Sequence, residues 1–130
     1  MLEQMQDHFN DEEIIKLNIE QNMARWEYLL EFNETEIEFL TNLLLSKRTD
    51  NSEQVDFLLQ KMEEVKETNT LHKKTFLDFK INLEGRRECD EIECETHYVK
   101  QYFVLKEILL KYFQAFRDEK SGVYAYFKEL

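Results

Sequence analysis

The chain has 130 residues, of which 35% are charged and 13% aromatic, with two glycines, no proline and a formal net charge of −11. Chains rich in strands and loops need more turn-forming residues, and disordered chains contain fewer aromatic residues. This composition therefore favours long helices that bury one face. The length suits one domain with a substantial core. The acidic surface repels phosphate groups, which disfavours binding to nucleic acid or to anionic membranes.

The sequence also bears on the compartment. Its first residues, MLEQMQDHFNDEE, lack the basic start and the apolar stretch of a signal peptide. No apolar run approaches the roughly 18 residues that cross a bilayer. The two cysteines, Cys89 and Cys94, are too few for the disulfide framework of a small secreted protein. We therefore expect a cytoplasmic protein that does not enter a membrane.

The first helix is predicted over about residues 11–48. Asn10 and Glu13 have the spacing of a capping box, and Lys47 and Arg48 suit the negative end of a helix. Residues that favour burial recur along this segment at steps of three and four, which is the pattern of one helix face. This first stripe consists of Ile19, Met23, Trp26, Leu30, Asn33, Ile37, Leu40 and Leu44.

A turn is predicted at residues 49–52, where the sequence Thr-Asp-Asn-Ser interrupts the apolar pattern. Asp50 or Ser52 can cap a second helix over about residues 52–84, and so short a link makes the two helices antiparallel. Gly85 suits the end of this helix, and a break is expected at residues 85–90. The second stripe consists of Val55, Leu58, Met62, Val65, Asn69, His72, Phe76, Phe79 and Leu83.

A third helix is predicted over about residues 90–120, with Asp90 and Glu93 in capping-box spacing. Ser121 and Gly122 mark its end, and residues 122–130 are expected to form a short helix or an extended tail. The helix carries two apolar stripes about 100° apart. The first contains Tyr98, Tyr102, Leu105, Leu109, Tyr112 and Phe116, and the second contains Val99, Phe103, Leu110 and Phe113.

Together these elements predict a single all-α domain over residues 1–130, an antiparallel up-down-up bundle of three long helices. The first and third helices carry more apolar surface than a three-helix core buries. A fourth helix built from the chain ends, a second copy of the chain in a homodimer, or a helix of another protein could cover this surplus. The predicted interaction surface consists of Tyr28, Phe32, Phe39, Tyr98, Tyr102, Phe103, Tyr112 and Phe113.

Three polar residues, Asn33, Asn69 and His72, occupy positions in the apolar stripes of the first two helices. In a hairpin that turns near residue 50, Asn33 lies about one turn from Asn69, and His72 lies opposite Trp26. An unpaired polar group in a core costs about 1–3 kcal/mol, so this polar core layer needs partners. It could bind a ligand or a proton. A buried asparagine more often sets the register of packed helices, and the stripe could also turn toward solvent at this level.

The segment at residues 86–97 contains the weak candidate metal ligands Cys89, Glu93, Cys94 and His97. Glu93 and His97, or Cys94 and His97, share a helix face and could contribute two ligands to Zn²⁺. A four-ligand site needs two more, and no second cluster exists in the sequence. The cysteine spacing also differs from that of a CxxC redox motif. A solvated, acidic helix start is the favoured interpretation, so no metal and no cofactor are predicted.

No catalytic residue is predicted. The Glu-x-x-His pairs of di-iron carboxylate bundles are absent, as are a Gly-x-Ser-x-Gly motif and a glycine-rich phosphate loop. The apolar surplus on two helices favours a non-enzymatic protein-interaction or structural bundle, whose partner is another protein or a second copy of the chain. The alternative is a small-ligand or metal-binding bundle that uses the polar core layer or the Cys89–His97 segment.

Overall fold

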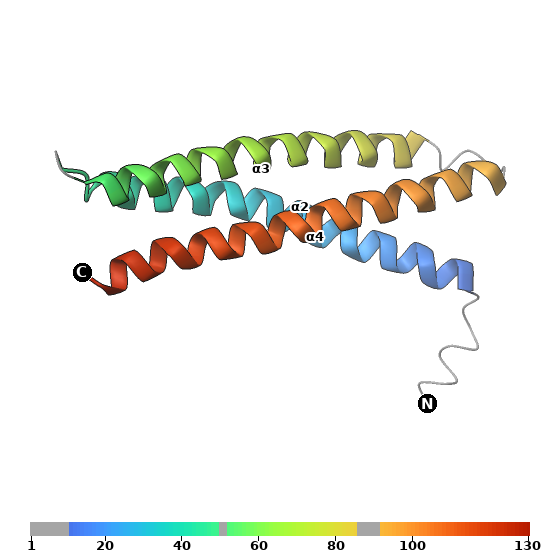
Figure 1. Ribbon diagram of the computed structural model, residues 1–130. Helices are drawn as coiled ribbons and strands as arrows, with labels where there is room; N and C mark the ends of the chain where they lie inside the picture. Colours follow the sequence, from blue (N-terminus) through green and yellow to red (C-terminus); the bar gives the residue numbers. More distant parts are fainter. Residues whose placement is uncertain (1–10, 50–51, 86–91) are drawn as a thin grey trace, which may run out of the picture.

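The computed structural model describes residues 11–49, 52–85 and 92–130, and three helices account for nearly all of them. Helix α2 covers Asp11–Leu45, α3 covers Glu53–Gly85 and α4 covers Ile92–Lys128. Figure 1 shows that α3 runs back along α2 and that α4 reverses direction again. The predicted all-α, up-down-up bundle of three long helices is confirmed, and no strand occurs within the described ranges.

The core is built from the predicted stripes. Every residue of the first stripe is buried, and so is every residue of the first stripe on α4. Fully burying a large apolar side chain stabilises the fold by about 1.5–3 kcal/mol, so the core holds these helices together far more than local propensity does. Near the turn between α2 and α3, a smaller core cluster consists of Leu40, Leu44, Val55, Leu58, Met62 and Val123.

Helix α4 continues through Gly122 to Lys128, which corrects the predicted helix end at Ser121 and Gly122. Val123 is fully buried in the smaller core cluster, and Tyr126 and Phe127 pack against the same cluster. Burial of these side chains outweighs the roughly 1 kcal/mol that a glycine costs inside a helix relative to alanine. The last residues therefore belong to the long helix and do not form a separate segment.

The turn between α2 and α3 is held by a serine cap. Helix α2 ends at Leu45, slightly before the predicted end, and hydrogen-bonded turns follow it. The Ser52 carbonyl accepts a hydrogen bond from the Asp56 amide at 2.9 Å, and the Ser52 hydroxyl accepts one from the Thr49 amide at 2.9 Å. Ser52 is thus the N-cap of α3. The other predicted caps Asn10, Asp50 and Asp90 lie outside the described residues.

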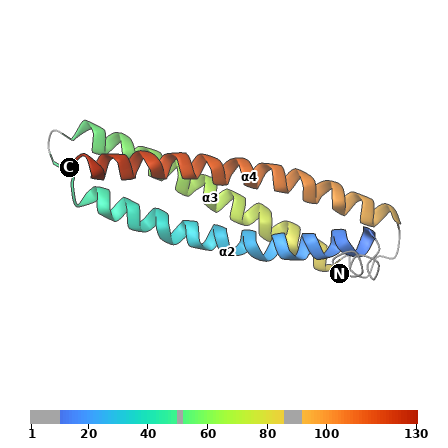
Figure 2. The ribbon, with the colours of Figure 1, turned by 90° about the horizontal axis from the view of Figure 1, so that it is seen from below.

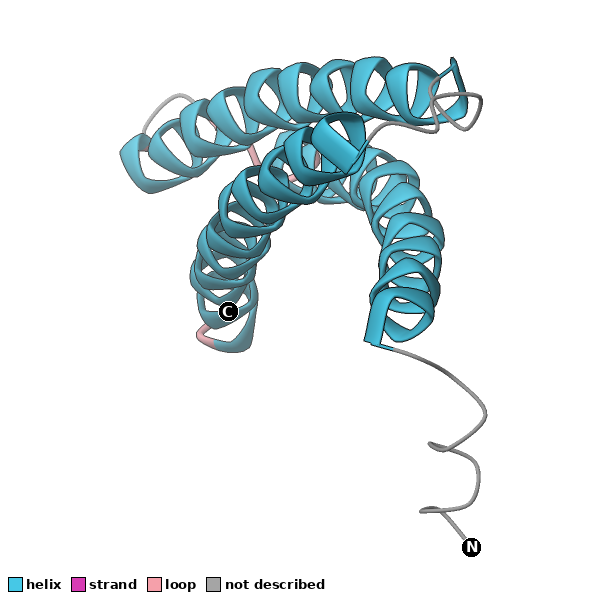
Figure 3. Ribbon diagram, turned by 90° about the vertical axis from the view of Figure 1, so that its right-hand side faces the viewer, coloured by secondary structure: helices cyan, strands magenta, loops and turns pink. Residues whose placement is uncertain are grey.

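The three helices do not pack equally closely. Helix α3 lies closely along α2, whereas α2 and α4 approach each other over only a short stretch. Two ion pairs join α2 to α3, Lys73–Glu34 and Lys80–Glu27, each with a nitrogen–oxygen distance of 3.0 Å. Figure 2 shows α2 and α4 in front of α3, and Figure 3 shows α2 and α4 diverging on the side away from α3. The side between α2 and α4 is therefore the most open one.

Candidate functional site

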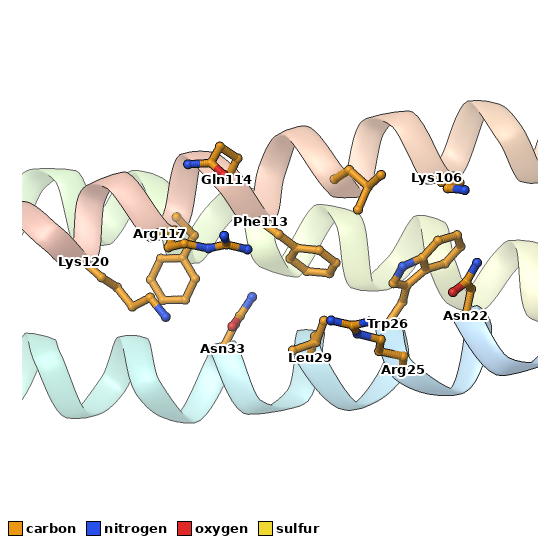
Figure 4. A pocket seen from close by; sticks show the side chains of 12 residues that line it. Asn22, Arg25, Trp26, Leu29, Asn33, Lys106, Phe113, Gln114, Arg117 and Lys120 are labelled. Carbon is orange, nitrogen blue, oxygen red and sulfur yellow. The ribbon is translucent and has the colours of Figure 1, made fainter.

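A groove with a volume of about 470 Å³ runs between α2 and α4. All of its lining residues come from these two helices, and α3 passes behind it (Figure 4). Asn33 and Trp26 extend from α2, and Phe113 and Lys120 extend from α4, into the same space (Figure 4). The lining residues are Asn22, Arg25, Trp26, Leu29 and Asn33 of α2, and Lys106, Leu110, Phe113, Gln114, Phe116, Arg117 and Lys120 of α4.

The groove is elongated along the bundle. Its lining residues lie at positions 22–33 of α2 and 106–120 of α4. At 1.5 Å per residue these segments are about 16 and 21 Å long, which corresponds to three to four helical turns. A groove of this length between two helices matches the shape of another helix better than that of a compact small molecule.

Apolar and cationic side chains share the same rows along the groove. Residues seven apart lie almost on one line of a helix, with a drift of about 20°. On α4, one row contains Lys106, Phe113 and Lys120, and a neighbouring row contains Phe103, Leu110 and Arg117. On α2, a row next to the groove contains Arg25, Phe32 and Phe39. Each wall of the groove therefore offers both apolar contacts and positive charge.

Four cations line the groove, and no carboxylate is among its lining residues, although the chain has 28 acidic and 17 basic side chains. Lys120 pairs with Glu36 of α2 at 3.2 Å. Among the residues that the structure describes, Arg25, Lys106 and Arg117 have no carboxylate oxygen within 4.0 Å. The groove thus carries positive charge that is not neutralised at short range, and it favours an anionic group.

Part of the predicted interaction surface is exposed beside this groove. On α2, Tyr28, Phe32 and Phe39 are 65%, 47% and 60% exposed, and the rings of Tyr28 and Phe32 stack with centroids 6.0 Å apart. We call these three residues the aromatic stripe. On α4, Phe103 is 52% exposed and Phe113 is half-buried in the groove wall. Leu110, which was not in the predicted surface, is 51% exposed and also lines the groove.

The other three predicted surface residues, Tyr98, Tyr102 and Tyr112, belong to the core. Their rings are buried, and each hydroxyl reaches a polar group inside the bundle. The Tyr98 hydroxyl donates to the Asn82 carbonyl, and the Tyr102 hydroxyl accepts a hydrogen bond from Asn22 at 2.6 Å. These tyrosines are therefore not part of a surface that a partner could reach, because their apolar rings are needed between the helices.

The polar core layer forms a hydrogen-bonded network across all three helices. Asn69 on α3 donates to the Leu30 carbonyl of α2 at 3.1 Å, and the Tyr112 hydroxyl of α4 donates to the Asn69 Oδ1 at 2.7 Å. Burial raises the pKa of Tyr112, and a side-chain hydrogen bond with Asn33 opposes this rise. Asn33 and Asn69 are both buried, and Tyr112, which the stripe pattern indicated only as a core position, is a further member of the network.

His72 occupies the edge of this layer. Its ring meets the Tyr112 ring edge-on, with centroids 5.0 Å apart, and burial lowers the pKa of His72. Within the described part of the chain, no buried side-chain nitrogen or oxygen lacks a hydrogen-bond partner. The layer is therefore satisfied by the protein itself and does not require a ligand to complete its hydrogen bonds.

Most of the candidate metal segment lies outside the described side chains. Cys89 lies outside the described residues, the side chains of Glu93 and Cys94 are not among those described, and His97 is exposed at the start of α4. In the described ranges, no three His, Cys, Asp or Glu side chains are grouped closely enough to hold a metal ion. In those same ranges, no helix has the length and apolarity needed to cross a bilayer.

No known protein family, no curated protein and no solved structure matches the chain. Its class is defined by its own geometry, an all-α bundle of three long antiparallel helices with a cation-lined groove between the first and the third of them.

Proposed function

We propose that this chain is a non-enzymatic protein-interaction bundle that binds a helix of its partner along the groove between α2 and α4. The observation that carries this proposal is the second apolar row on each of these helices. The first rows fill the core, whereas the second rows lie beside the groove, with no helix of the described chain covering them. An amphipathic helix laid along the groove would bury these rows and complete a four-helix arrangement.

The large exposed side chains of α2 and α4 support this proposal because several of them lie in rows that adjoin the groove. Single exposed apolar residues are ordinary on protein surfaces, but contiguous groups of them mark binding sites. On α2, the stacked rings of Tyr28 and Phe32 begin the aromatic stripe beside the groove, and on α4, Phe103 lies in the same row as Leu110, which lines the groove. Aromatic residues and arginine are also the residue types that contribute most to binding energy at protein interfaces.

Site-specific photo-crosslinking tests the proposal. A Leu110→benzoylphenylalanine variant places the reactive group in the groove, and an Ile81→benzoylphenylalanine variant places it on α3, which contributes no residue to the groove. Ile81 is 65% exposed, so the control position is as accessible as Leu110. Each full-length variant is irradiated in an extract of the cells in which the protein naturally occurs. We expect a protein-sized crosslinked product from position 110 and none from position 81.

Two further outcomes distinguish the alternatives. Small-molecule adducts at position 110, without protein products, would instead favour the small-ligand bundle, for which the four cations of the groove would bind an anionic ligand. Equal products at both positions, or none at either, would contradict a binding role for this groove. Adding Arg117→Glu to the Leu110 variant provides an internal control, because it should weaken specific capture without blocking the reactive group.

A further inference from the structure

We infer that the helix bound in the groove is α2 of a second copy of the chain, in a two-fold symmetric dimer. This inference rests on the proposed function and names the partner. It follows from a second surface on the outer side of α2. That surface has exposed carboxylates beside aromatic rings, whereas the groove is lined by cations and by no carboxylate. The aromatic stripe forms the apolar part of that surface.

Two exposed carboxylates lie on one side of the aromatic stripe. Glu31 and Glu38 are one heptad apart, so they lie on one line of α2, next to Phe32 and Phe39. Both are exposed, and no Lys, Arg or His nitrogen of the described residues lies within 4.0 Å of their oxygens. Their neighbours Glu27 and Glu34, in contrast, pair with lysines of α3. Hydrogen bonds with these two neighbours raise the pKa of Lys73 and Lys80, and the nearby charge of Glu31 adds to this rise, so Glu31 is partly compensated by α3 without forming an ion pair. The outer side of α2 thus combines the aromatic stripe with exposed carboxylates that make no ion pair at short range.

The groove carries the complementary set. Leu110 and Phe113 supply apolar contact, and Arg25, Lys106 and Arg117 supply cations without carboxylate partners in the described chain. An α2 helix in the groove would bury its aromatic rings against Leu110 and Phe113. It would also bring its carboxylates close to the three cations. Because each copy has a net charge of −11, two copies repel each other at long range. Association therefore depends on this local match of opposite charges.

The placement of the two surfaces allows a closed dimer. Arg25, which lines the groove, lies in the same row of α2 as Phe32 and Phe39 of the aromatic stripe. Groove and stripe therefore occupy neighbouring faces of one helix. Two copies with antiparallel α2 helices, related by a two-fold axis, can each place their stripe in the groove of the other. Such an isologous interface is closed and leaves no unused copy of either surface, which is the commonest arrangement of soluble oligomers.

Charge reversal and mixing test this inference on the full-length chain. The groove variant combines Lys106→Glu with Arg117→Glu, and the stripe variant combines Glu31→Lys with Glu38→Lys. The matched control combines Lys66→Glu with Lys74→Glu, two exposed lysines of α3 outside the groove, and it changes the net charge as the groove variant does. Native mass is measured by sedimentation equilibrium over a wide concentration range with reductant present, and circular dichroism checks that each variant is folded.

We expect the unmodified chain and the control to form dimers. Each charge-reversed variant should bind itself at least about ten-fold more weakly, because like charges then face each other at both contacts. An equimolar mixture of the groove variant and the stripe variant should recover the dimer, since both contacts in the mixed pair again join opposite charges. This recovery also shows that the separate variants are folded and able to bind.

Three results would overturn the inference. They are an unmodified chain that is monomeric at every concentration, a dimer that survives both reversals, and a mixture of folded variants that does not associate. The photo-crosslinking experiment separates this failure from failure of the proposed function. A monomeric chain that crosslinks another protein through position 110 retains the helix-binding function with a different partner. If position 110 gives no specific crosslinked product, the proposed helix-binding function itself is contradicted.

Discussion

Asn69 connects all three helices through two hydrogen bonds, one to the main chain of α2 and one to Tyr112 of α4. Its side chain is 2% exposed, so water cannot replace either partner. If α3 moved along its neighbours by one heptad, the amide would face apolar side chains and the two hydrogen bonds would be lost. The polar core layer therefore favours one register of the bundle over its shifted alternatives, in the way that buried asparagines act in coiled coils.

Removing the Tyr112 hydroxyl tests the network. Tyr112→Phe leaves the Asn69 Oδ1 buried without its donor, so we expect the free energy of unfolding in urea to fall by about 1–3 kcal/mol. Asn69→Leu should also destabilise the fold. The double variant should be less destabilised than the two effects combined, because replacing both partners leaves fewer unpaired groups. Strictly additive effects in this double-mutant cycle would contradict a coupled network.

His72 gives the fold a pH dependence. Burial lowers the pKa of His72 below its ordinary value of 6.5, so the unfolded chain binds more protons than the folded chain as the pH falls below that value. The stability present above the unfolded pKa is then lost as the pH falls toward the folded pKa. We expect the free energy of unfolding to decline more steeply between about pH 7 and pH 5 in the unmodified chain than in His72→Gln. Parallel profiles would contradict this prediction.

At the scale of the helices, periodicity was sufficient to predict the number of helices, their direction and almost all of the core. The first stripe of α2 and the first stripe of α4 are buried residue for residue, because their steps of three and four place each stripe on one face that packs against the other helices. The end of α4 was predicted wrongly because Ser121 and Gly122 are local signals. The burial of Val123 against α2 and α3 depends on residues far away in the sequence, which a local pattern does not contain.

The candidate site was predictable only in part, for a related reason. The surplus of apolar residues on the first and third helices was visible in the sequence, and so were Phe32, Phe39 and Phe103. Which of two adjacent stripes faces the core depends on how the helices are rotated about their axes. This rotation decides that Tyr98, Tyr102 and Tyr112 are buried, and that Lys106 and Arg117 of α4 meet Arg25 of α2 in one groove. The spacing of residues within a single helix does not determine how that helix is rotated against its neighbours.

Gly122 offers a direct test of the long α4 helix. Nothing lies within 4 Å of a Cβ atom added at this position, and the residue is inside the helix and exposed. Gly122→Ala should therefore stabilise the chain by up to about 1 kcal/mol in urea unfolding, because alanine favours the helix and loses less backbone entropy on folding. Gly122→Pro is the matched control and should destabilise it. A chain that tolerates both substitutions equally would have no helix at this position.

For the molecule as a whole, acidic and basic side chains are divided unequally among the helices. Residues 1–48, which include α2, carry 11 of the 28 acidic side chains but only 4 of the 17 basic ones, whereas α4 supplies three of the four groove cations. Glu27 and Glu34 of α2 pair with lysines of α3, and Glu36 of α2 pairs with Lys120 of α4. The chain thus combines a net negative charge with a short groove whose local charge is positive.

The position of Trp26 makes the groove observable by light. This residue is the only tryptophan of the chain, it is 3% exposed, it stacks on Tyr102 with ring centroids 5.4 Å apart, and it lines the groove. All indole fluorescence of the protein therefore originates at the groove wall. A helix or ligand that enters the groove changes the polarity and the quenching groups around that single ring. The protein consequently carries an intrinsic optical reporter of its own occupancy, and titrations with candidate partners need no attached dye.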